Sequence, residues 1–231
     1  TSLTSMNKGE SFEDTIRMID GYSDLIVIRH PENGSAKRAA DVATAPVINA
    51  GDGSNEHPTQ ALLDLYTIQS RFGKLTNLKV LVAGDLLYGR TARSLLQGLS
   101  LYKGNTIYLL SPKQLRIDSV LLKRLRKDLT VIEISNEKQI PDDCHVWYWT
   151  RIQKERIKSK KLLNELKNTF VVTNKLLEKK GNKKMIIMHP LPRVGEISTE
   201  VDSDPRALYF QQAKNGLYIR MALLALILKK I

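Results

Sequence analysis

Several residue types and patterns are scarce in this sequence. It holds a single cysteine, Cys144, among 231 residues, which excludes an intramolecular disulfide and a cysteine-rich zinc site. Its longest apolar run, residues 221–228, is far shorter than the ~20 residues that span a bilayer. Aromatic residues make up only 6%, without the clustered aromatic motifs on which single-stranded nucleic acids stack. We therefore expect neither a membrane nor a nucleic acid among its partners.

Acidic residues are also fewer than basic ones: the sequence has 24 Asp and Glu and 36 Lys and Arg, which gives a net charge of +12. The lysines are scattered beside helical apolar positions, which is typical of solvated helix faces and loops. A basic field of this kind also suits small dianionic substrates, which it steers toward a cleft. The remaining composition, 42% hydrophobic and 26% charged, excludes a disordered or fibrous chain.

Helical and strand patterns alternate along almost the whole chain. Helices are expected at residues 10–22, 36–43, from Pro58 to about 68, after Gly89, and at 207–230. Short apolar strands are expected at residues 25–28, 46–49, 78–83, 106–110, 130–134, 146–149, 170–172 and 185–188. Strands alternating with helices in this way predict an α/β fold with doubly wound parallel sheets.

A domain junction is expected where proline and glycine crowd together, at residues 45–57. Residues 1–45 would then belong to a first domain and residues 46–206 to a second. The apolar C-terminal helix, about 207–231, is expected to pack back on the first domain.

Arginines follow four of the predicted strands. In an open α/β sheet, ligands bind beyond the carboxyl ends of the strands, and those ends carry Arg29, Arg90, Arg151 and Arg193. Because guanidinium groups match the oxygens of carboxylates and phosphates, such a set indicates a site for polyanionic ligands. His57 stands just before Pro58 at a helix start, where free N–H groups favour negative charge.

Other kinds of site have weaker support. The four histidines, at positions 30, 57, 145 and 189, have no metal-ligand spacing, so no metal is expected. Residues 84–89 lack the GxGxxG turn of dinucleotide sites, and no GxSxG elbow supports a serine nucleophile. Cys144 is expected to be a buried apolar residue.

Five segments in order resemble the aspartate carbamoyltransferase family. They are NAGDGSNEHPTQALLDLYTI (49–68), GDLLYGRT (84–91), TRIQKER (150–156), MHPLPRVGEI (188–197) and YFQQAKNGLYIRMALLAL (209–226). The resemblance runs from about Lys8 to the C-terminus. It implies a two-domain carbamoyltransferase fold and transfer of the carbamoyl group of carbamoyl phosphate to the α-amino group of L-aspartate. This step of pyrimidine biosynthesis uses no cofactor and no metal.

The same resemblance implies roles for individual residues. Arg29 and His57 would contact carbamoyl phosphate as the catalytic pair, with His57 polarising the carbonyl oxygen. Gln60 and the backbone at Leu191 and Pro192 would hold the carbamoyl nitrogen.

On the aspartate side, the resemblance implies that Arg90, Arg151 and Gln153 grip the amino acid. Lys8, with Ser5, would belong to a loop that enters the neighbouring subunit's site, so that the active unit is a homotrimer. Regulatory chains would be further partners, and the location would be cytoplasmic.

The chain departs from the family in one respect. The Ser-Thr-Arg-Thr-Arg run that forms the family's principal phosphate-binding motif is absent. We therefore expect the first domain to be incomplete, which leaves open whether this chain alone catalyses transfer or acts only as a binding or assembly module. An ornithine-type carbamoyltransferase is a sibling alternative. Leu191, where those enzymes carry a cysteine, and residues 150–156 favour aspartate.

Overall fold

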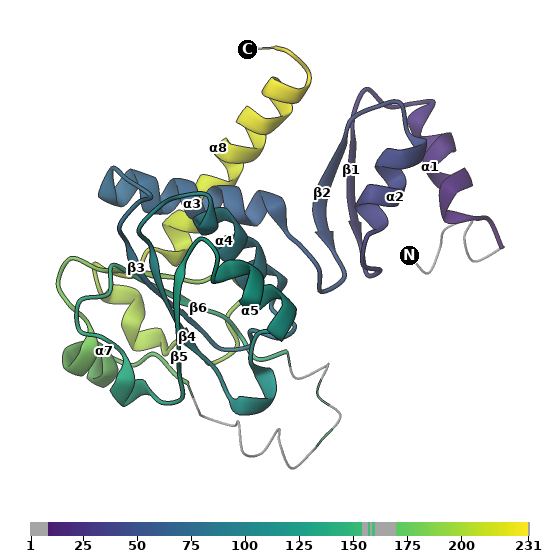
Figure 1. Ribbon diagram of the computed structural model, residues 1–231. Coiled ribbons are helices and arrows are strands. Elements are labelled where there is room, and N and C mark those ends of the chain that lie inside the picture. Colours follow the sequence, from purple (N-terminus) through teal and green to yellow (C-terminus); the bar gives the residue numbers. More distant parts are fainter. Residues whose placement is uncertain (1–8, 154–156, 158, 160–169, 231) are drawn as a thin grey trace.

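A computed structural model describes residues 9–153, 157, 159 and 170–230, which form two parallel sheets and their helices (Figure 1). The first sheet and its surroundings comprise α1 (Phe12–Asp20), β1 (Ile26–His30), α2 (Ser35–Val42) and β2 (Val47–Asp52), followed by α3 (Pro58–Phe72). The second comprises β3 (Lys79–Ala83), α4 (Arg90–Ser100), β4 (Thr106–Leu110), α5 (Ser119–Leu125), β5 (Thr130–Ile134), β6 (Val146–Trp149), α7 (Asn174–Lys180), β7 (Ile186–Met188) and α8 (Tyr209–Ile227).

The larger sheet has the strand order β5-β4-β3-β6-β7, and each neighbouring pair is parallel. From β3 the chain runs outward through β4 to β5 and then returns to place β6 on the other side of β3. The order of the strands thus reverses between β3 and β6, which is where ligands bind in open α/β sheets. The predicted doubly wound α/β fold is confirmed.

Both faces of this sheet are covered, which explains why its strands read as unbroken apolar runs. One core joins alternate residues such as Val80 and Tyr148 to the leucines of α3, α4 and α5. The other joins Leu81 and Trp147 to α7 on the opposite face. Cys144 lies in this second core, as predicted, and burial raises the pKa of its thiol to about 12, so the thiol is not a nucleophile.

Strand β2 pairs with β1 in parallel register, Ile26 opposite Val47. The expected domain boundary after residue 45 therefore runs between two strands of one sheet, and a boundary beyond β2 fits the pairing better. The predicted turn-rich junction is itself partly strand, because β2 continues to Asp52, with Ile48, Gly51 and Asp52 buried.

Helix α8 packs chiefly against α3, with a smaller contact to β7, rather than directly against residues 1–45 as expected. The two helices cross in Figure 1, and the C-terminal part of α8 extends beyond α3. Large apolar side chains on that part, including Leu217, Met221 and Leu226, are exposed.

The predicted strand at residues 170–172 is wrong. Phe170 has a φ of +57°, outside strand geometry, and Val172 forms only an isolated parallel bridge with Ile197. The apolar run that suggested a strand is buried for another reason: Val172 fills the core beneath α7.

Candidate active site

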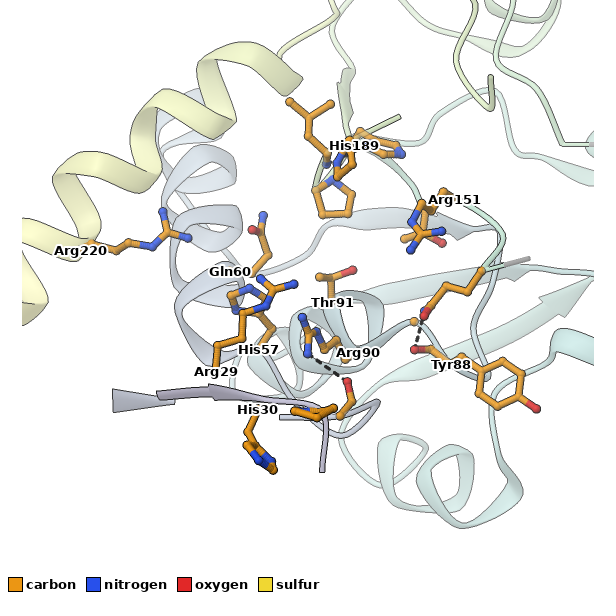
Figure 2. A pocket seen from close by; sticks show the side chains of 18 residues that line it. Arg29, His30, His57, Gln60, Tyr88, Arg90, Thr91, Arg151, His189 and Arg220 are labelled. Atoms are coloured by element: carbon orange, nitrogen blue, oxygen red, sulfur yellow. Dashed lines mark hydrogen bonds between the residues drawn. The ribbon is translucent and has the colours of Figure 1, made fainter. Parts of the chain in front are cut away.

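A cavity of about 760 Å³ opens where both sheets end. Its walls come from the ends of β1, β3, β6 and β7, the first turns of α3 and α4, and one residue of α8 (Figure 2). It is lined by Arg29, His30, Pro31, Gly53, His57, Gln60, Tyr88, Gly89, Arg90, Thr91, Thr150, Arg151, Gln153, His189, Pro190, Leu191, Pro192 and Arg220. None of these residues is an aspartate or a glutamate, so the wall formed by described residues is strongly positive.

The floor of the cavity lies at the reversal of strand order. Ala83 and Trp149 are register partners at the ends of β3 and β6, so the residues that follow them meet. Gly84 has a φ of +110°, and a Cβ there would lie 2.1 Å from the backbone oxygen of Thr150. Only glycine lets the two strand ends approach so closely.

Arginine side chains converge on this cavity, but they are not the four that the sequence indicated. Arg29, Arg90 and Arg151 line it, whereas Arg193 does not. Both terminal nitrogens of Arg193 donate to the carboxylate of Asp202. The fourth arginine of the lining is Arg220, which reaches in from α8.

Arg90 is held in place by backbone groups of the loop after β2. Its Nη1 donates to the carbonyl oxygen of Gly53 at 3.0 Å, and the guanidinium lies so close to Gly51 that a Cβ there would sit 2.8 Å from Cζ. Gly51, with a φ of +117°, therefore meets two needs, a left-handed backbone and room for the guanidinium.

His57 occupies the N-cap position of α3, without a side-chain capping bond, and lies among the arginines of the cavity. Its backbone N–H donates to Oγ of Ser94 at 2.8 Å, which ties α3 to α4. Burial, reinforced by the positive charges of Arg90, Arg29 and Arg220, lowers the pKa of the imidazole to about 4. The ring is therefore neutral near pH 7 and has one N–H to donate.

This pKa gives a test that needs no substrate. We expect the His57 ring protons to titrate near pH 4 in an NMR titration, and we expect Arg90→Ala to move that midpoint upward, toward the ordinary value of about 6.5. Between these two pH values the folded protein binds fewer protons at His57 than the unfolded chain, so its stability decreases as the pH falls through this window. A midpoint near 6.5 in the unsubstituted protein would contradict this electrostatic picture.

The loop after β7 is shaped by the buried ring of His189. Its Nδ1 accepts from the backbone N–H of Leu191 at 2.8 Å, and Nε2 lies 2.8 Å from the carboxylate of Glu196. The proton is therefore on Nε2, and neither nitrogen is left for catalysis. Leu191 takes a left-handed φ of +49° before a cis bond to Pro192, and both residues line the cavity.

Of the remaining predicted site residues, Gln60 and Gln153 line the cavity with amide groups that already have partners. The Gln153 amide donates to the carbonyl of Tyr88 at 2.7 Å, and that of Gln60 donates to Asp64 at 2.9 Å. Ser5 and Lys8 lie outside the described residues.

Sequence reasoning missed Ser94, Asp64 and Arg220. Spacing carried part of the signal, since Ser94 lies one helical turn after Arg90 and Asp64 one turn after Gln60. Gln212, Gly216 and Arg220 likewise recur every fourth residue on α8. Because α8 carries apolar residues on several faces, its sequence pattern does not single out this row of three residues.

Metal binding and membrane crossing were also considered for the described residues. Among them, no group of three His, Cys, Asp or Glu side chains is placed to hold a metal ion. No helix in that part of the chain combines the length and apolar character needed to cross a membrane.

The fold and the cavity together define a class: a doubly wound α/β protein with an arginine-lined crevice at the carboxyl ends of its strands. Family comparison makes this specific. Residues 76–227 match the Asp/Orn binding domain of aspartate/ornithine carbamoyltransferases, and residues 1–70 match the carbamoyl-P binding domain. The chain belongs to this family, and the similar proteins described next are named aspartate carbamoyltransferases, as the sequence motifs predicted.

Among similar proteins, a chloroplastic aspartate carbamoyltransferase of Arabidopsis thaliana is 50% identical over 98% of this chain and 58% of its own length. The catalytic subunit from Alkaliphilus oremlandii is 46% identical over 100% of this chain and 70% of its own. The chain thus spans less than two thirds of the plant relative.

Solved structures agree with these relatives. The catalytic subunit of M. jannaschii aspartate transcarbamoylase superimposes with a TM-score of 0.89 at 44% identity, covering 98% of this chain and 74% of that one. The Trypanosoma cruzi enzyme in complex with N-(phosphonacetyl)-L-aspartic acid gives 0.88 at 38% identity, over 97% and 72%.

The expected cytoplasmic location is contradicted by the plant relatives. The Arabidopsis protein and three Pisum sativum proteins of 48–49% identity are named chloroplastic. Membership of the family therefore does not imply a cytoplasmic protein.

Proposed function

We propose that this chain forms the site at which a carbamoyl group passes from carbamoyl phosphate to the α-amino group of L-aspartate. One observation carries the proposal: His57 and Gln60, on one turn of α3, share a single cavity with four arginines. Solved relatives from Trypanosoma cruzi hold carbamoyl phosphate and aspartate together, or carbamoyl aspartate and phosphate, which supports both substrates and both products.

On the donor side, Arg29 meets the phosphate and carbonyl oxygens of carbamoyl phosphate, and His57 donates its one N–H to the carbonyl oxygen. The neutral state of the His57 ring suits this role, because the ring donates without surrendering a proton. Gln60 and the carbonyl groups of residues 190–192 accept from the carbamoyl nitrogen.

On the acceptor side, Arg90, Arg151 and Gln153 bind the two carboxylates of aspartate. The lining supports a dianionic acceptor over ornithine, because a cationic side chain would face arginines without any carboxylate among the described lining residues.

With both substrates fixed, the amino nitrogen attacks the carbonyl carbon. The N–C bond forms, an oxyanion develops beside His57 and Arg29, and the C–O bond to phosphate breaks. The amino proton leaves with the phosphate or to water. Much of the acceleration comes from orientation, and the preorganised donors stabilise the oxyanion.

We further propose that the protein acts in pyrimidine biosynthesis as a homotrimer, in which Lys8, with Ser5, completes a neighbouring subunit's site. Regulatory chains are proposed as additional partners. The names of two relatives as catalytic subunits support an assembly of more than one kind of chain.

The test is a carbamoyl-transfer assay with aspartate and ornithine as competing acceptors, using the complete native polypeptide that contains this chain. We expect N-carbamoyl-L-aspartate as the product and at least a hundredfold preference for aspartate. Preference for ornithine would establish the sibling activity. Absence of transfer to either acceptor, with both substrates bound, would establish a binding module instead.

A further inference from the structure

Asp64 is a completely buried carboxylate beside the cavity that the proposed reaction does not use. It lies on α3, one turn after Gln60, with no exposed surface. Its Oδ1 accepts from the side-chain amides of Gln60 at 2.9 Å and Gln212 at 2.6 Å, and its Oδ2 accepts from the hydroxyl of Tyr148 at 2.8 Å. These partners come from α3, α8 and β6, so Asp64 joins three elements at the back of the cavity.

The orientation of Gln212 is fixed independently of Asp64. Its Oε1 accepts the backbone N–H of His189 at 2.8 Å, so its Nε2 must point toward the carboxylate. The Oδ1 atom of an ionised carboxylate can only accept hydrogen bonds, so the side chain of Gln60 must also approach it with a donor. Gln60 therefore also turns its Nε2 toward Asp64 and keeps its Oε1 for another group.

The arrangement withstands a change in the charge of Asp64. Burial raises the pKa of this carboxyl to about 7, against the opposing hydrogen bonds from Gln212, Tyr148 and Gln60 and the charge of Arg220. A proton on Oδ2 could be donated to the Tyr148 oxygen, which leaves Oδ1 as acceptor for both amides. With the proton at that position, Gln60 keeps the orientation that it has beside the ionised carboxylate.

We propose that Asp64 is a positioning residue that fixes the Gln60 amide with its carbonyl oxygen available to N–H donors in the cavity. The consequence is selectivity for a donor substrate with an –NH2 group on its reacting carbonyl. This inference rests on the proposed function, because it assigns a substrate preference to the same site. Without Asp64, the Gln60 amide can rotate so that its N–H groups face the N–H groups of the carbamoyl nitrogen. Two donors then oppose each other, and no hydrogen bond forms.

Acetyl phosphate is a suitable probe, because it replaces the –NH2 of carbamoyl phosphate with a methyl group of similar size. It keeps the phosphate and the carbonyl oxygen, so Arg29 and His57 can treat both compounds alike. Only a group that accepts from the carbamoyl nitrogen distinguishes them. The ratio of the two dissociation constants therefore reports on Gln60 and on the carbonyl groups of residues 190–192, and the part of it that Gln60→Ala removes reports on Gln60.

The experiment measures both dissociation constants by calorimetry in the complete native polypeptide and in four variants. Asp64→Leu removes the acceptor, Asp64→Asn keeps an acceptor oxygen for the two amides, and Gln60→Ala removes the amide itself. Thr67→Val is the structural control: it removes the buried bond that Asn215 donates to Thr67 between the same two helices, one turn away from Asp64 and without contact to Gln60.

We expect the unsubstituted protein to favour carbamoyl phosphate by roughly tenfold or more, as loss of one buried hydrogen bond implies. Asp64→Leu should lose the part of this preference that Gln60→Ala loses, to within about threefold, while acetyl phosphate binds almost unchanged. Asp64→Asn and Thr67→Val should keep the preference. The double variant Gln60→Ala/Asp64→Leu should lose no more than Gln60→Ala alone.

Equal weakening of both ligands by Asp64→Leu, or an undiminished preference, would overturn the positioning role. If Asp64→Leu does not fold, Asp64→Ala, which leaves room for water, supplies the same comparison with the same two outcomes. The proposed function itself would be contradicted if the unsubstituted protein bound neither carbamoyl phosphate nor acetyl phosphate, or bound both equally well.

Discussion

Replacing His57 by alanine is expected to lower kcat for carbamoyl transfer by about 10²–10³-fold, the range found when one oxyanion donor is removed. KM for aspartate should change far less, because the ring acts on the carbonyl oxygen of the other substrate. Steady-state kinetics on the complete native polypeptide separates the two constants. The effect requires that His57 acts as a preorganised donor rather than as a helix cap alone.

His145 provides the matched control for this substitution. It is a half-buried histidine at the amino-terminal end of β6, opposite to the cavity, and its Nδ1 accepts from the backbone of Lys79. His145→Ala removes a half-buried imidazole at the opposite end of the strands and should leave kcat nearly unchanged. A His57→Ala protein with near-normal turnover would sink the assignment of the donor.

Replacing Arg29 by alanine is expected to reduce kcat/KM for carbamoyl phosphate by at least about 10²-fold. Charge-assisted hydrogen bonds contribute about 1.5–3 kcal/mol each, and a guanidinium fork makes two of them. Arg29→Lys should give an intermediate loss, because it keeps the charge and loses the fork. The pKa of His57 should also rise in Arg29→Ala, since Arg29 is one of the charges that lower it.

Arg193→Ala is the corresponding control, because Arg193 also follows a strand of the sheet but pairs with Asp202 outside the cavity. We expect it to lower stability without changing kcat/KM for carbamoyl phosphate. If Arg193→Ala and Arg29→Ala had the same effect on catalysis, the loss would reflect general positive charge rather than placement.

The sequence predicted the sheet well because its strands are buried on both faces. A strand such as Lys79–Ala83 has no solvent side, so its composition alone distinguishes it from the helices around it. Residues at predicted strand ends or at a helix start, namely Arg29, His57 and Arg151, could therefore be assigned to one site, although Arg29 belongs to the smaller sheet and Arg151 follows a strand of the larger one. Parallel strands bring those positions together whatever the details of the loops.

The rest of the site depends on contacts between distant segments. Arg193 follows β7, but its guanidinium binds Asp202 and Tyr209 and does not line the cavity. Asp64 and Gln212 are 148 residues apart, and nothing in the local pattern of either helix indicates that they meet. Arg220 reaches the cavity only because α8 crosses α3. Such contacts follow from packing, which a single sequence does not display.

The central claim is that one cavity holds the donor's phosphate and both carboxylates of the acceptor side by side. Calorimetric titration of the complete native polypeptide with N-(phosphonacetyl)-L-aspartic acid, which joins these groups in one molecule, tests it most directly. We predict saturable binding at one site per chain, at least about 10²-fold tighter than phosphate or aspartate alone, as linked ligands bind when their sites are adjacent. Binding no tighter than that of aspartate by itself would contradict the claim.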